Sequence, residues 1–118
     1  MSYAKVTTKT YDFTKFFMEQ DCKQCKIVKT KYTNNENTAL GILNDNNEFE
    51  LLLTANLDFK LPENKVLLKN YGENNGIVQE LLSFNIVKLT GVKYPSGFVE
   101  LIEAEVLNLE DYKIDFEG

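Results

Sequence analysis

Two cysteines lie three positions apart in Cys22-Lys23-Gln24-Cys25, a spacing found in zinc sites and in thiol redox pairs. A structural zinc site takes about four ligands, usually Cys or His, and this chain contains two Cys and no His. A thioredoxin-type pair stands where a strand runs into a helix, whereas these cysteines follow a predicted helix and enter a predicted strand. We therefore expect no metal at this pair, and we expect Cys22→Ser/Cys25→Ser to keep the fold and any binding activity.

The residues that usually carry out catalysis are few in this chain. It has no His, the side chain that titrates near neutral pH, and all 13 basic residues are Lys. No Ser or Cys therefore has a His partner for nucleophilic attack, and the six Gly lack the spacing of a phosphate loop. We expect a protein without enzymatic activity, catalytic residues or a cofactor.

Acidic residues concentrate at the C-terminal end. Residues 98–118 hold seven acids and one Lys, while residues 1–31 hold seven Lys and three acids. The net charge of −5 and the absence of Arg disfavour direct binding to nucleic acid. An acidic surface can complement a basic groove on a partner protein, and a plain solvated face is the alternative. The candidate partner-binding residues are Glu100, Glu103, Glu105, Glu110 and Asp111.

A second candidate site is the polar stretch of residues 69–76, which precedes a predicted helix. Free N–H groups in such a loop can bind an anion, and ordinary helix capping explains the same residues equally well. The ligand would be a nucleotide or another small molecule. The alternative ligand-binding residues are Lys69, Tyr71, Glu73, Asn74 and Asn75.

The elements that would position these residues follow from the spacing of apolar side chains. The first helix is predicted from Phe13, Phe16 and Phe17, with Asp12 as its N-cap. The predicted elements, in chain order, are a helix over residues 12–20, strands over 24–32, 38–43, 48–57 and 66–69, a helix over 75–85, and a hairpin of 87–93 and 98–107.

Strict alternation makes residues 48–57 the clearest strand. One face carries the apolar residues Phe49, Leu51, Leu53, Ala55 and Leu57, as expected for a half-buried strand. Substitution of Leu53 by Asp should therefore destabilise the protein severely, because it would bury an unpaired charge.

The last hairpin is predicted to turn at Tyr94-Pro95-Ser96-Gly97, which fits a type I turn with Pro second and Gly fourth. Alternation fails in its second arm. A bulge at Leu101-Ile102 would restore it and place Glu100, Glu103 and Glu105 on one face.

Together these elements predict a single α+β domain over residues 1–118, with a mainly antiparallel sheet and one or two helices on one face. Residues 1–10 form an arm or a strand, and residues 108–118 an acidic tail. The polar N-terminus and the lack of a long apolar run predict a cytoplasmic protein without a membrane span. The oligomeric state stays open.

One group of motifs points to a family. Thr54-Ala55-Asn56-Leu57, Leu61-Pro62, residues 66–71, Glu73-Asn74 and the following helix resemble a small bacterial and phage family, domain of unknown function 4313, over residues 24–90. The family has no assigned activity. The resemblance implies a phage, plasmid or integrated element, where small acidic proteins often inhibit host defence. The function it implies is a non-enzymatic inhibitor of a host protein, for instance a nucleic-acid-binding defence nuclease; the alternative is a nucleotide sponge.

Overall fold

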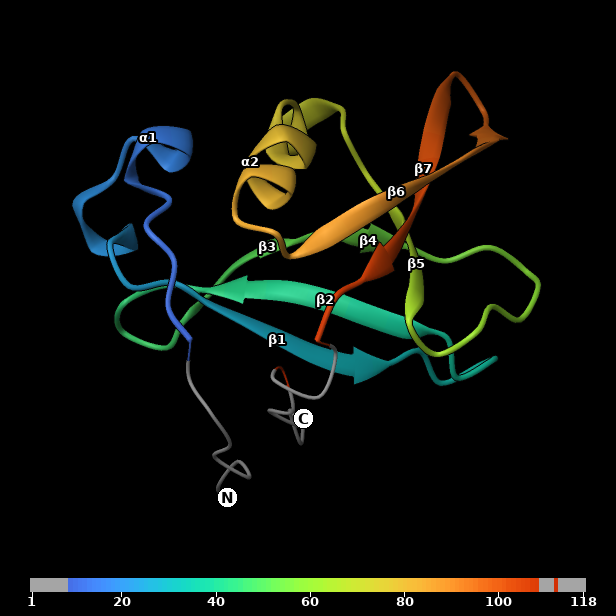
Figure 1. Cartoon of the computed structure of the whole chain (residues 1–118), viewed down its shortest axis with the longest axis horizontal. Coiled ribbons are helices and arrows are strands. Elements are labelled where there is room, and N and C mark those ends of the chain that lie inside the picture. Colours follow the sequence, from blue (N-terminus) through green and yellow to red (C-terminus); the bar gives the residue numbers. More distant parts are fainter. Residues whose placement is uncertain (1–8, 109–111, 113–118) are drawn as a thin grey trace.

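The computed structural model describes residues 9–108 and residue 112 (Figure 1). Glu110, Asp111 and most of the predicted arm and tail lie outside these described residues. The elements, in chain order, are α1 (Thr14–Phe17), the 3-10 turn η1 (Gln20–Cys22), β1 (Lys26–Lys31), β2 (Thr38–Leu43), β3 (Phe49–Leu52), β4 (Thr54–Ala55), β5 (Lys65–Leu68), the 3-10 turn η2 (Gly72–Asn74), α2 (Ile77–Ser83), β6 (Val87–Ser96) and β7 (Val99–Val106).

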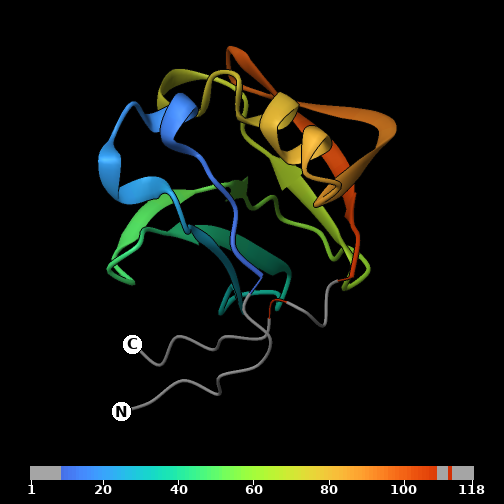
Figure 2. The ribbon, with the colours of Figure 1, turned by 60° about the vertical axis from the view of Figure 1, so that its left-hand side comes forward.

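The strands form two antiparallel sheets, with the orders β1-β2-β3 and β4-β5-β7-β6. The two short helices lie on the same side of the molecule, across from the β1–β2 hairpin (Figure 2). The predicted α+β class with antiparallel pairing is therefore confirmed, and the strands divide between two sheets. Neither helix in the described part of the chain is long and apolar enough to cross a membrane.

Leu53 is the residue at which the chain passes from one sheet to the other. Its N–H donates to the carbonyl of Leu40 in β2, and its own carbonyl accepts from Lys69, just after β5. The predicted strand of residues 48–57 is consequently split into β3 and β4. Leu53 itself is fully buried, as its place in the alternation predicts.

Phe49 departs from that alternation, because its side chain is 55 % exposed. It lies beside a register shift between Ile42 and Leu43, and its ring covers Gly41. A Cβ atom at position 41 would come within 2.6 Å of the Phe49 ring, so only Gly leaves room for this packing.

The β6–β7 hairpin differs from the prediction in both its turn and its bulge. Ser96 pairs with Val99, so the turn is Gly97-Phe98, with φ of +65° at Gly97. The register shift lies in β6 between Leu89 and Lys93, around Gly91 with φ of +92°. The predicted bulge at Leu101-Ile102 is wrong because β7 is a central strand, where a bulge would disrupt hydrogen bonds on both sides; β6 is an edge strand.

The helix boundaries also shift from those predicted. The Asp12 carboxylate accepts from the Thr14 N–H at 2.9 Å, although the N-cap residue is Phe13 and not Asp12 as predicted. The helix α1 ends at Phe17, and Met18 after it has φ of +57°. For α2, the Asn70 side chain accepts from the N–H groups of Gly76 and Val78, so Asn70 caps the start of this helix. Asn85 follows the helix with φ of +58°, in the left-handed conformation expected of a helix stop.

The main core lies between the sheets and the helices, and it contains buried residues from both sheets and from α2. The α2 residues Ile77, Val78 and Leu81 are buried there. Within this core the Tyr11 and Tyr112 hydroxyls share a hydrogen bond of 3.0 Å. A smaller apolar cluster of Leu61, Leu67 and Leu101 supports the second sheet from its other face.

Candidate functional site

The described acidic residues of the β6–β7 hairpin do not form one surface. Because β7 runs without a bulge, Glu103 and Glu105 point to one face and Glu100 points to the other. Glu100 is exposed, Glu105 is half-buried, and Glu103 is only 6 % exposed. The predicted shared face of the three carboxylates is therefore wrong.

Glu103 is instead bonded inside the hairpin. The Thr90 hydroxyl donates to one carboxylate oxygen at 2.5 Å, and the Tyr94 hydroxyl donates to the other at 3.3 Å. The Thr90 oxygen also accepts from the Val92 N–H at 3.3 Å. Burial, followed by the Glu103 charge, raises the pKa of the Tyr94 hydroxyl. Glu103 thus holds the bulge of the edge strand in place.

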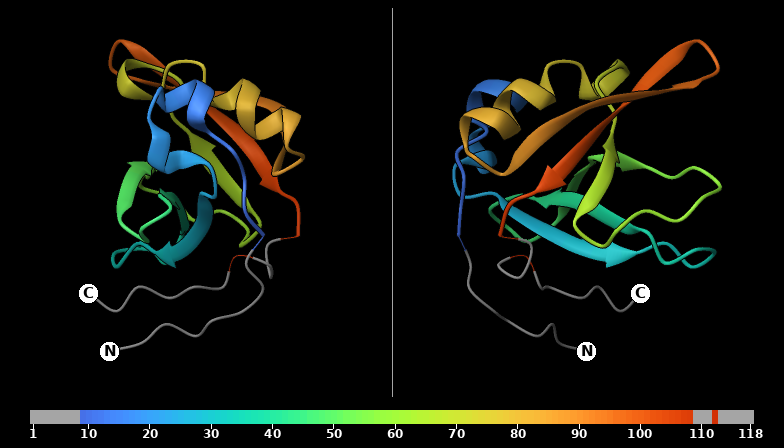
Figure 3. Two further views of the ribbon diagram at one scale, coloured as in Figure 1. Left: turned by 90° about the vertical axis from the view of Figure 1, so that its left-hand side faces the viewer. Right: turned by 45° about the vertical axis from the view of Figure 1, so that its right-hand side comes forward.

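Phe98 forms the tip of this hairpin and is fully exposed, at 108 % of the reference surface. The hairpin extends past the rest of the second sheet (Figures 1 and 3). Close to this tip, two pairs before the turn residues, the Tyr94 ring packs on Phe59, with ring centroids 5.2 Å apart. Sequence reasoning placed Phe98 at the start of a strand, although Gly97 before it is a local signal for the tighter turn.

The free edge of β6 is poorly suited to pairing with another strand. Ser96–Val99 closes a two-residue turn, so the next pair, Pro95–Glu100, directs its backbone groups away from β7. Pro95 offers no N–H to this edge, and Lys93 adds a charge. The bulge around Gly91 bends the remaining edge. Any partner of the hairpin would therefore contact side chains.

The structure does not bring the predicted ligand-binding residues of the loop together at one site. Asn74 is buried and donates to the Leu52 carbonyl at 2.8 Å, which is a structural role. Tyr71 lines a cleft of about 330 Å³. Glu73 and Asn75 line a different cleft, and Lys69 lines neither. The other residues of the smaller cleft are Asn70, Lys93, Val99, Glu100 and Ile102.

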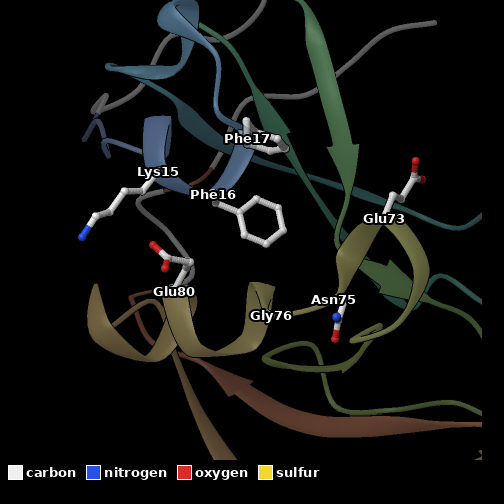
Figure 4. Close-up of a pocket in the computed structure, with 7 residues that line it drawn as sticks. All are labelled: Lys15, Phe16, Phe17, Glu73, Asn75, Gly76 and Glu80. Atoms are coloured by element: carbon white, nitrogen blue, oxygen red, sulfur yellow. The ribbon is translucent and has the colours of Figure 1, made fainter.

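The larger cleft lies between α1 and the η2–α2 segment and has a volume of about 730 Å³. Phe16 projects into its middle, with Lys15 and Glu80 on one side and Glu73 and Asn75 on the other (Figure 4). Two carboxylates against one ammonium group give the lining a negative charge, which disfavours a nucleotide. We call this site the α1–α2 cleft. Its lining residues are Lys15, Phe16, Phe17, Glu73, Asn75, Gly76 and Glu80.

Both cysteines are fully buried, and Cys22 adjoins an acidic group formed with Glu19, Asp21 and Glu50. The possible ligand atoms of these four residues lie within 4.8 Å of one another. Burial is the main cause that raises the pKa of both thiols, that of Cys25 to about 11. A protonated thiol is a poor metal ligand, so the carboxylates would have to hold a cation. Sequence reasoning missed this group because Glu50 comes from a distant strand.

Comparison with known proteins supplies no relative: no family model, no curated protein and no solved structure gives a significant match to the chain. The resemblance to the phage family stays a prediction. Function has to be inferred from the hairpin, the two clefts and the cysteine-containing group.

Proposed function

We propose that the protein is a non-enzymatic binding protein that engages another protein through the tip of the β6–β7 hairpin, with Phe98 as its anchor. The observation that carries this proposal is the complete exposure of Phe98 on a projecting turn. An aromatic side chain in that position gains most when it enters an apolar pocket, and aromatic residues dominate the energetics of many interfaces.

Contacts in the part of the hairpin next to the tip support such a role. Tyr94 packs on Phe59 and donates to Glu103, while Leu101 is buried in the smaller apolar cluster. These contacts fix the hairpin before a partner arrives. Less conformational freedom is then lost on binding, which raises affinity.

The partner's chemistry follows from charge and from the free edge of the sheet. A net charge of −5 and an exposed Glu100 near the tip favour a partner pocket bordered by basic residues. Pro95, Lys93 and the bulge disfavour strand addition, so the pocket would receive side chains. In the setting implied by the phage resemblance, the partner would be a host protein, for instance a nucleic-acid-binding defence nuclease.

The test is affinity purification from host lysate, followed by reconstitution with the purified partner. Phe98→Ala should weaken the dissociation constant by about 30-fold, as expected for an anchor residue. Its melting temperature should not change, because the Phe98 side chain lies outside both cores. The matched control is Met18→Ala, another highly exposed apolar side chain, and it should bind normally. Equal affinities for wild type and Phe98→Ala would refute the proposal.

A further inference from the structure

We infer that the α1–α2 cleft is a second binding site, which takes a small organic cation of the alkylammonium class. The site is separate from the β6–β7 hairpin and does not depend on the function proposed for it. The cleft is broad and largely open to solvent, and its volume of about 730 Å³ leaves room for a ligand of this size.

The aromatic ring in the middle of the cleft suits such a ligand. The half-buried Phe16 ring lies over Gly76, where a Cβ atom would be 3.8 Å from the ring. The ring presents its surface to the cleft (Figure 4). An ammonium group is attracted to an aromatic face, and the alkyl part of the ligand covers apolar surface that water would otherwise contact.

The charges at the rim provide the second part of the site. Glu73 and Glu80 flank Phe16 from opposite sides, and neither carboxylate forms a salt bridge within the described part of the chain. Lys15 lies on the same side as Glu80 and is equally without a salt bridge among those residues. The rim therefore keeps a net negative charge for a cation to neutralise, and Lys15 competes with that cation.

An anionic ligand is disfavoured by the backbone as well as by the rim. The N–H groups of Asn74 and Asn75 donate to the carbonyls of Tyr71 and Gly72, at 2.9 and 3.1 Å. The N–H of Gly76 donates to the Asn70 side chain at 3.2 Å. The three consecutive donors that would hold a phosphate are already engaged, so the cleft offers carboxylates and an aromatic ring.

The inference is tested by titrating the isotope-labelled protein at constant ionic strength, with amide chemical shifts as the readout. The probes are n-butylammonium chloride, the neutral n-butanol, sodium butyrate and adenosine monophosphate. Butylammonium should shift the amides of Asn75, Gly76 and Glu80 in a saturable manner, and the other three probes should not. Saturable shifts of the same amides by the monophosphate, or equal binding of butanol and butylammonium, would overturn the inference.

Variants separate recognition from mere structural change. Glu73→Gln and Glu80→Gln should each weaken butylammonium binding about two- to fivefold, and Lys15→Gln should tighten it by a similar factor. Phe16→Leu keeps apolar volume but loses the aromatic face, so binding should fall about two- to fivefold. Glu63→Gln, an exposed carboxylate outside the cleft, is the matched control. If Lys15→Gln fails to tighten binding, the electrostatic basis of the site is wrong.

Discussion

The Thr90 hydroxyl donates a 2.5 Å hydrogen bond to the Glu103 carboxylate across the β6–β7 hairpin. This contact joins the bulge of an edge strand to a central strand that is bonded on both sides. Glu103, one of the five acids predicted to bind a partner, therefore stabilises the hairpin that carries Phe98. Substitution of Glu103 should therefore affect binding by changing the shape of the hairpin.

Removal of this carboxylate should lower stability. Glu103→Ala leaves the Thr90 and Tyr94 hydroxyls without their acceptor, and we expect a loss of about 1–3 kcal/mol in the free energy of unfolding. Glu100→Ala, an exposed acid on the same strand, should change it by less than about 0.5 kcal/mol. Urea denaturation measures both variants. Equal effects of the two substitutions would mean that the internal bonds of Glu103 contribute nothing.

Leu53 provides a test of the junction between the two sheets. Because it is fully buried and bonded to both sheets, Leu53→Asp should unfold the protein, and Leu53→Ala should cost about 2–5 kcal/mol. Leu89→Asp, on the exposed edge strand, is the control and should stay folded. Circular dichroism with thermal melting decides the outcome. Normal melting of Leu53→Asp would show that the register of β3 and β4 is wrong.

The buried thiols predict a loss of stability at alkaline pH. Folding raises the pKa of both cysteines, and that of Cys25 reaches about 11, so the folded state keeps protons that the unfolded state releases above about pH 9. Stability should be unaffected below that pH and should decline as pH rises from 9 to 11, by up to about 1.4 kcal/mol per pH unit for each thiol. Urea unfolding across this range measures the slope.

The control for that experiment is Cys22→Ala/Cys25→Ala, which keeps the Tyr and Lys residues that also titrate at high pH. Its stability should fall less steeply between pH 9 and 11. An identical slope in wild type and the double variant would contradict the assignment of the effect to the thiols.

Substitution of both cysteines by Ser should preserve the fold at reduced stability, because each places a hydroxyl in the main core. A loss of about 1–3 kcal/mol is expected where the buried hydroxyl stays unpaired. The loss should be smaller at position 22, where the Cys22 sulfur already donates to the Asp21 carboxylate at 3.7 Å. Metal analysis of the purified wild-type protein completes this test. One zinc ion per two chains, lost in Cys22→Ser/Cys25→Ser together with dimerisation, would make the pair a metal clip between subunits.

Local chemistry was enough to predict much of the fold. The short strand β2 and the helix α2 are determined by neighbouring residues, and each was predicted close to its observed place. The split of the predicted strand at Leu53 was not predicted. Alternation indicates which face of a strand is buried, but it does not indicate which other strand pairs with it. The bulge was misplaced for the same reason, since edge and central strands differ only in their distant partners.

The candidate sites were harder to predict than the elements. Glu103 was assigned to an exposed acidic face with Glu100 and Glu105, because acids on a strand are usually solvated. The hydroxyl groups that bind it come from the opposite strand, which the local sequence does not reveal. The α1–α2 cleft exists only because two helices distant in sequence lie side by side. Phe98 is the exception, because the Gly before it is a local signal for a two-residue turn that would have exposed it.

The most direct measurement of the role of Phe98 replaces it with the photoreactive analogue p-benzoylphenylalanine and irradiates the protein in host lysate. We expect one dominant adduct that disappears when excess wild-type protein competes and persists when excess Phe98→Ala is added. The analogue at Met18 should give no such adduct. A dominant adduct from position 18 with none from position 98, or equal competition by wild type and Phe98→Ala, would contradict binding through the hairpin tip.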